Sequence, residues 1–178
     1  MSPRVLVAGI GNVFLGDDGF GVAVAQRLAA APLPEGVVVS DVGIRALHLA
    51  FALLERPELL VVVDTVSRGQ PPGTLYLIEP DLDRELPPGN VPDAHAMNLQ
   101  SVRTALRSLG GELPPTFLVG CEPASIGEQM SLSDVVERAI PAAVRMVQQL
   151  IAQQLGDTDV SVAKEGPDEL PGAQNTQT

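Results

Sequence analysis

The chain has 178 residues, of which 45% are hydrophobic, and it carries a formal net charge of -11 at pH 7. This length fits one domain with a sizeable core, and the acidic balance argues against nucleic acid and anionic membrane surfaces as partners. No apolar run approaches the roughly 18 residues that a membrane span needs, and no signal peptide is apparent, so we expect a cytoplasmic protein.

The cysteine and lysine content excludes several kinds of catalysis. The single cysteine, Cys121, rules out an internal disulfide and a cysteine-based zinc site, and it agrees with a reducing compartment. The only lysine, Lys164, lies near the C-terminus. A phosphate-binding-loop lysine, a Schiff-base lysine and a serine–lysine dyad are therefore excluded from the body of the chain, and no GxSxG string provides a serine nucleophile.

The first third of the chain alternates strand and helix patterns. Residues 5–10 form a nearly unbroken apolar run, as expected of a strand that is buried on both faces. Apolar residues at helical spacing follow, and the alternation continues with a strand, a helix and a strand. These elements are expected at 19–31, 37–41, 46–54 and 59–64. Such alternation is typical of a parallel, doubly wound α/β sheet.

The fourth strand pattern, at 74–79, breaks this alternation. Only residues 65–73 separate it from the third strand, whereas a parallel crossover needs a dozen residues or more. We therefore expect an antiparallel strand at an edge of the sheet. A helix at about 97–109 and a fifth strand at 116–120 follow. The result is a five-stranded, mostly parallel sheet.

The C-terminal part divides into a helical region and a tail. The helical region begins within 131–140 with Ser131 or Ser133 as the cap, and we expect Pro141 to interrupt it before a second segment. Residues 156–178 contain few apolar side chains and cannot bury enough surface to offset their ordering entropy. We expect one domain over 1–155 and a disordered acidic tail.

Polar residues follow the predicted strands at their carboxyl ends, where open α/β sheets bind ligands. Asp17 and Asp18 follow the first strand, Asp41 ends the second and Asp64 ends the third, while His95 follows a later loop that also holds Asp93. Long-range convergence of carboxylates and an imidazole would suit a borderline divalent ion such as nickel, zinc, cobalt or manganese, without choosing among them.

The adjacent pair Asp17 and Asp18 has a structural interpretation and a functional one. Carboxylates at a helix N-terminus satisfy free amides and complement the helix dipole, so one of the pair could act only as a cap. The nearby Gly16, Gly19 and Gly21 leave the loop open for close approach. We expect Asp17 to cap or support the loop and Asp18 to point into the site.

Four further residues are weaker candidates. Packing or an edge-of-core hydrogen bond is the expected role of His48, and a buried, inert thiol is expected at Cys121. Glu122 could line the site, and Arg45 could meet a carboxylate or phosphate of a substrate.

Two other function classes share parts of this pattern. Gly9 and Gly11 resemble a dinucleotide-binding fingerprint with Asp41 on a ribose, but Phe14 replaces the third glycine and the two carboxylates would repel a pyrophosphate. A receiver-like signalling module also carries an acidic pair and a strand-end aspartate, but Glu122 stands where its lysine is needed.

Five sequence blocks together resemble the [NiFe]-hydrogenase maturation endopeptidases. They are GIGNVFLGDDGFG at 9–21, VVVDTV at 61–66, PPGT at 71–74, DAHAMNL at 93–99 and GCEP at 120–123. The similarity runs from about residue 4 to residue 155 in the family's order and spacing. The first block is the most specific of the five.

The resemblance implies a three-layer α/β/α sandwich with an antiparallel fourth strand. It also implies an aspartic-type endopeptidase that removes a C-terminal peptide from the hydrogenase large-subunit precursor, with nickel already in that substrate as the recognition element. The family's metal-contacting residues fall on Asp18, Asp64 and His95. We expect no organic cofactor, nickel carried by the substrate, and a monomer.

The sequence departs from the family at two places. Asp18 stands where many members have glutamate, and residues 41–45 replace a glycine-glycine-threonine string that follows an aspartate. The second departure bears on which hydrogenase is processed more than on the reaction. A metal would polarise the scissile carbonyl or activate water, and Asp17 or Asp41 remains a candidate supporting base.

Overall fold

A computed structural model describes residues 4–83 and 94–156, except for the side chains of residues 94–98. The described chain folds into five strands, four α-helices and one 3-10 turn. In order these are β1 (Val5–Ile10), η1 (Gly16–Gly19), α1 (Phe20–Ala29), β2 (Val37–Gly43), α2 (Ala46–Leu53), β3 (Leu59–Thr65), β4 (Leu75–Ile78), α3 (Ala94–Ser108), β5 (Thr116–Cys121) and α4 (Asp134–Leu155).

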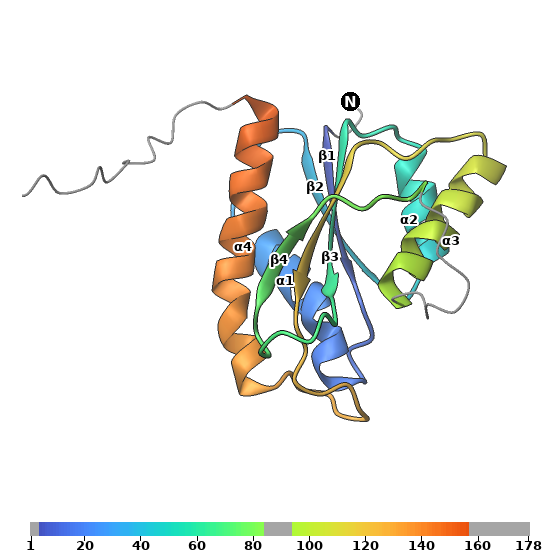
Figure 1. The fold of residues 1–178 in the computed structure, drawn as a ribbon. Coiled ribbons are helices and arrows are strands. Elements are labelled where there is room, and N and C mark those ends of the chain that lie inside the picture. The colour runs from blue at the N-terminus through green and yellow to red at the C-terminus, as the bar shows by residue number, and fades with distance from the viewer. Residues whose placement is uncertain (1–3, 84–93, 157–178) are drawn as a thin grey trace, which may run out of the picture.

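The strands form one mixed sheet in the order β2-β1-β3-β5-β4 (Figure 1). Neighbouring strands are parallel except for β4, which pairs antiparallel with β5 at the edge of the sheet. The predicted direction and edge position of the fourth strand are therefore confirmed. The short β3–β4 connection leaves no room for a crossover helix, which is the physical reason for the reversed direction.

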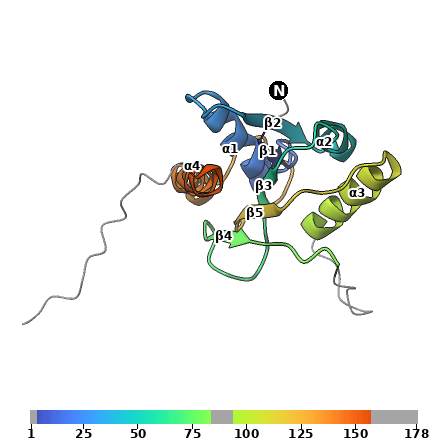
Figure 2. The same ribbon diagram turned by 90° about the horizontal axis from the view of Figure 1, so that it is seen from above.

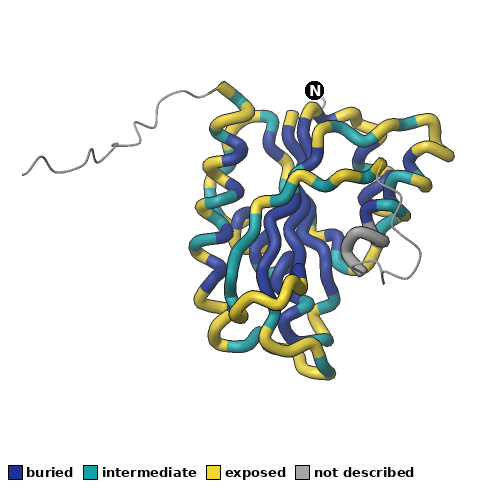
Figure 3. Tube along the Cα trace, viewed as in Figure 1, coloured by how far each residue is buried: buried dark blue, intermediate teal, exposed yellow. Residues whose placement is uncertain are grey.

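Helices cover both faces of the sheet, with α1 and α4 on one face and α2 and α3 on the other (Figure 2). Every residue of β1 and β3 is buried (Figure 3). Successive side chains enter opposite layers of the core. Val5 and Val7 pack toward α1 and α4, whereas Leu6 and Ala8 pack toward α2 and α3. The chain is a three-layer α/β/α sandwich, as expected.

The glycines around the first loop serve internal packing. A Cβ on Gly21 would lie 2.1 Å from the carbonyl oxygen of Val63, and one on Gly9 would lie 2.3 Å from the carbonyl oxygen of Gly21. Gly16 similarly faces the carbonyl oxygen of Ser125. The expectation that Gly16 and Gly21 leave the loop open is wrong, because these glycines let backbone segments meet.

The last helix runs without interruption through Pro141, contrary to the prediction. Proline lacks the amide that would bond to the carbonyl of Glu137, but Pro141 and Glu137 are both exposed, so water can reach that carbonyl. Gly156 ends the helix in a left-handed conformation. Among helices in the described part of the chain, none has the length and apolarity to cross a membrane.

Candidate active site

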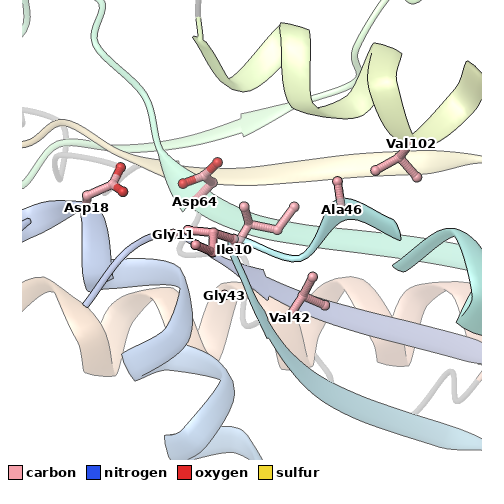
Figure 4. A pocket seen from close by; sticks show the side chains of 9 residues that line it. Ile10, Gly11, Asp18, Val42, Gly43, Ala46, Asp64 and Val102 are labelled. Carbon is pink, nitrogen blue, oxygen red and sulfur yellow. The ribbon is translucent and has the colours of Figure 1, made fainter. Parts of the chain in front are cut away.

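A small cavity of about 100 Å³ lies at the carboxyl ends of β1, β2 and β3. Two carboxylates, those of Asp18 and Asp64, line it together and carry its charge (Figure 4). The remaining lining residues are backbone glycines and apolar side chains, namely Ile10, Gly11, Val42, Gly43, Ile44, Ala46 and Val102. The parallel topology therefore brings two of the predicted site residues to one place.

Asp64 enters the cavity from the end of β3. Only 2% of the residue is exposed, and its Oδ1 accepts a hydrogen bond of 2.8 Å from the backbone amide of Thr65. The preceding strand is apolar and wholly buried, so the fold holds this carboxylate at the carboxyl end of the central strand. Burial of an ionised carboxylate is costly unless strong donors or a cation accompany it.

Asp18 reaches the same cavity from the 3-10 turn η1. Its Oδ2 accepts a hydrogen bond of 2.8 Å from the amide of Asn12, and its Oδ1 accepts one of 3.4 Å from the hydroxyl of Thr65. Thr65 thus links the turn to the strand that carries Asp64. Gly11 has φ of 137°, and a Cβ there would lie 1.8 Å from the carbonyl oxygen of Asp18, so the turn rests directly on this glycine.

Asp17 is fully buried and has a different role from its neighbour. Its Oδ2 accepts hydrogen bonds from the amides of Ala124 and Ser125 at 2.8 and 2.9 Å and from the Ser133 hydroxyl at 2.9 Å, while its Oδ1 accepts one of 2.6 Å from the Ser133 amide. Burial raises the pKa of Asp17, but these donors outweigh it and hold that pKa below the ordinary value. Asp17 fastens the turn that carries Asp18 to the loop between β5 and α4.

The sequence anticipated support by Asp17 but not its partners, which lie more than 100 residues away in the chain. Ser133 stands at the N-cap position of α4, as predicted, yet its hydroxyl donates to Asp17 and makes no cap bond. A bridge between Leu15 and Gln129 joins the same two loops.

Asp41 and Arg45 lie beside the cavity and do not line it. Asp41 is exposed and accepts a 3.2 Å hydrogen bond from the side-chain amide of Gln26. Both residues line an adjacent hollow of about 420 Å³ between the glycine loop and the β2–α2 loop. The two spaces share Gly11, Gly43 and Ile44, so the hollow is continuous with the rim of the cavity.

Glu122 does not line the cavity, contrary to expectation. Its carboxylate accepts hydrogen bonds from the amides of Arg68 and Gly69, at 2.9 and 3.1 Å, and from the hydroxyl of Tyr76 at 2.5 Å. The Tyr76 bond and the loop amides hold the pKa of Glu122 below its usual value, while burial and the same carboxylate raise the pKa of Tyr76 to about 12. Glu122 therefore organises the β3–β4 loop.

Two other predictions have opposite outcomes. Cys121 is fully buried, and burial first, then the charges of Asp17 and Glu122, raise the pKa of its thiol to about 12, which confirms an inert thiol. His48 is exposed on α2, so the predicted packing is wrong, while the alternative of an edge-of-core hydrogen bond stays a prediction. The exposed side of α2 carries His48 because Leu49, Ala50 and Leu53 occupy the inner face.

His95 is the second residue of α3, which begins three residues earlier than predicted. Its side chain lies outside the described residues, as do Asp93 and the tail from residue 157. Within the described side chains, no group of three histidine, cysteine or acidic residues could hold a metal ion. Asp18 and Asp64 supply two carboxylates, a type of donor that hard and borderline divalent ions accept.

Comparisons with known proteins agree on one family. The profile of the hydrogenase maturation protease family matches residues 22–150. The hydrogenase 2 maturation protease of Escherichia coli K12 is 32% identical over 148 residues, covering 81% of this chain and 88% of the relative. The hydrogenase expression/formation protein HupD of Rhizobium leguminosarum bv. viciae is 31% identical over 145 residues, covering 80% and 71%.

Solved structures show the same fold. The hydrogenase maturating endopeptidase HybD from Escherichia coli superposes with a TM-score of 0.71 at 27% identity, covering 85% of this chain and 93% of that one. The [NiFe] hydrogenase maturation protease HycI from Thermococcus kodakarensis superposes with a TM-score of 0.62 at 28% identity, covering 86% and 92%.

Proposed function

This chain belongs to the hydrogenase maturation protease family, and we propose that it removes a C-terminal peptide from the large-subunit precursor of a [NiFe]-hydrogenase after nickel insertion. An endopeptidase role in hydrogenase maturation follows from the family itself. Beyond this role, we propose that the reaction requires nickel and that the substrate is the large-subunit precursor. We also propose that the protein is a cytoplasmic monomer.

The observation that carries the proposal is the shared cavity of Asp18 and Asp64. Their segments are distant in sequence, yet both carboxylates lie at one mouth where a protein substrate could reach them. In the proposal, Asp18, Asp64 and His95 contact nickel that the precursor brings with it. Oxygen and nitrogen donors from the enzyme would complete the coordination of this nickel, to which the precursor contributes softer ligands.

Hydrolysis at this cavity would use water as the nucleophile. None of the residues lining the cavity is a serine, cysteine or threonine, so no covalent acyl intermediate is proposed. A water oxygen attacks the scissile carbonyl carbon, the carbon–nitrogen bond breaks, and one water proton passes by way of a carboxylate to the leaving amine. Contact with nickel in the substrate would also position the scissile bond close to the carboxylates of the cavity.

The surroundings of Asp18 argue against the dinucleotide-binding alternative. The amide of Asn12 would be one of the donors for a pyrophosphate, but it donates to the carboxylate of Asp18. A phosphate approaching the N-terminus of α1 would also meet that carboxylate at close range. The loop is therefore better suited to a cation or a protein substrate than to a phosphate.

The deciding experiment compares nickel-loaded and nickel-free precursors. Purified protein is incubated with each form of a large-subunit precursor from the same organism, and mass spectrometry measures the mass of the product. We expect one cut near the C-terminus of the nickel-loaded form only, with little effect of serine- or cysteine-protease inhibitors. Equal cutting of both forms would refute nickel recognition, and no cutting of any precursor from that organism would refute the proposed substrate.

A further inference from the structure

Three apolar side chains in the β2–α2 loop and on α2 are exposed, and the first of them lines the cavity. We call Ile44, Leu47 and Phe51 the apolar ridge; their exposed fractions are 74%, 55% and 51%. Leu47 and Phe51 are one turn apart on α2, so they lie on the same side of this helix. A fold alone does not require such a ridge, because the inner face of α2 already supplies its share of the core.

The apolar ridge is continuous with the candidate active site. Ile44 lines both the cavity of Asp18 and Asp64 and the adjacent hollow, where it faces the glycine loop. Phe14 lines the opposite side of that hollow and is 59% exposed. Anything that covers Ile44 therefore also lies over the mouth of the cavity.

We propose that the apolar ridge docks the folded body of the hydrogenase large-subunit precursor while the C-terminal segment of that precursor enters the cavity. This inference rests on the proposed function and concerns binding outside the scissile segment. A cavity of about 100 Å³ admits only a few atoms of a protein substrate, so most contact area must come from its surroundings. A stable protein interface buries on the order of 800 Å² on each partner.

The same geometry disfavours a second copy of this chain as the occupant. A copy seated on Ile44 would obstruct the cavity through which the substrate must be cut.

The test separates binding from chemistry with variants outside the cavity. The L47S/F51S double variant and each single variant are compared with wild type on the nickel-loaded precursor, measuring KM and kcat separately. We expect KM to rise at least 10-fold for the double variant with kcat within about twofold, because uniform binding is lost. The control is L77S, which removes a side chain that is 51% exposed on the edge strand β4. Circular dichroism and melting curves verify that each variant is folded.

Each outcome bears on the ridge. Unchanged KM in the folded double variant, with normal cutting by wild type, would overturn the ridge and leave the proposed function intact. An equal rise in KM for L77S would also overturn it, since the effect would not be local. Sedimentation that shows a dimer in wild type and a monomer in L47S/F51S would assign the ridge to a second copy instead. Wild type that neither binds nor cuts any precursor would overturn both proposals together.

Discussion

Two pairs of carboxylates near the ends of the strands have different neighbours, although Asp64 is buried like Asp17 and Glu122. The carboxylates of Asp17 and Glu122 each accept several hydrogen bonds, from the backbone amides of one loop and from a hydroxyl group. Asp18 and Asp64 line a cavity at the carboxyl ends of β1, β2 and β3. The first pair holds loops in place, whereas the second pair lines the cavity proposed as the active site.

Position at a strand end does not by itself make a carboxylate functional. Asp17 and Asp18 are consecutive in the same 3-10 turn, yet one is fully buried among amides and the other contributes to the cavity. What separates them is the number of donors around each side chain. Carboxylates with several amide donors have a lowered pKa and a fixed geometry, which suits a structural role.

The largest effect is expected from substituting the residues proposed to contact nickel. D64N, D18N and H95A should each reduce cutting of the nickel-loaded precursor at least about 100-fold, because a positioned acid, base or ligand contributes on this scale. Mass spectrometry of the precursor after timed incubation measures the loss. Far-UV circular dichroism should be unchanged, and a folded D64N variant with full activity would remove Asp64 from the mechanism.

The second effect concerns Asp17, whose loss should act first on stability. D17N replaces an acceptor of four hydrogen bonds with a group that cannot accept all of them, so we expect a loss of about 2–4 kcal/mol in the free energy of unfolding. D41N is the matched control, since Asp41 is exposed and accepts one hydrogen bond, and it should change stability by less than about 0.5 kcal/mol. Urea unfolding of both variants measures the difference.

The D17N variant should also change how the free energy of unfolding depends on pH. Because the pKa of folded Asp17 lies below the ordinary value of 3.8, its stabilisation is complete above that value and disappears as pH falls through the folded pKa. D17N should therefore lose less stability than wild type between neutral pH and the region below pH 3.8. Parallel losses in the two proteins would show that Asp17 is not the source of this dependence.

The fold was largely predictable because its signals are local. Buried runs such as 59–65 and the short connection before β4 define the strands and the one reversed direction. The prediction failed where tertiary position overrides a local rule. Pro141 continues the last helix because it faces solvent, a fact that its neighbours in sequence do not encode.

The site was predictable only in part, for the same reason. The sequence placed Asp18 and Asp64 at strand ends, and the parallel sheet brings them together. It did not identify the donors of Asp17 or the Tyr76 partner of Glu122, because these contacts connect residues at least 46 positions apart. The roles assigned to Asp18, Asp64 and His95 stay predictions, and the side chain of His95 lies outside the described residues.

A smaller effect is expected at Glu122, the other carboxylate with a structural role. Tyr76 is the only tyrosine and the chain has no tryptophan, so absorbance near 295 nm reports its ionisation directly. We expect a midpoint near pH 12 in the folded protein, since burial and Glu122 both raise the pKa of Tyr76. E122Q should move the midpoint toward the ordinary value of 10. A wild-type midpoint near 10, with circular dichroism still native, would contradict the hydrogen bond.

The smallest effect is expected from removing the C-terminal tail, whose acidic residues belong neither to the cavity pair nor to the structural pair. Residues 157–178 contain 5 of the chain's 22 acidic residues but few apolar side chains that could dock them on the body. Removing 157–178 while keeping Gly156, whose left-handed φ of 73° ends α4, should leave the melting temperature within about 1 °C and both kcat and KM nearly unchanged. Salt screens charges that are in contact with solvent, so repeating the assay at about 0.05 and 0.5 M salt separates electrostatic steering from docking. A melting temperature several degrees lower in the truncated protein, at either salt concentration, would mean that the tail packs against the domain and that its carboxylates belong with Asp17 and Glu122.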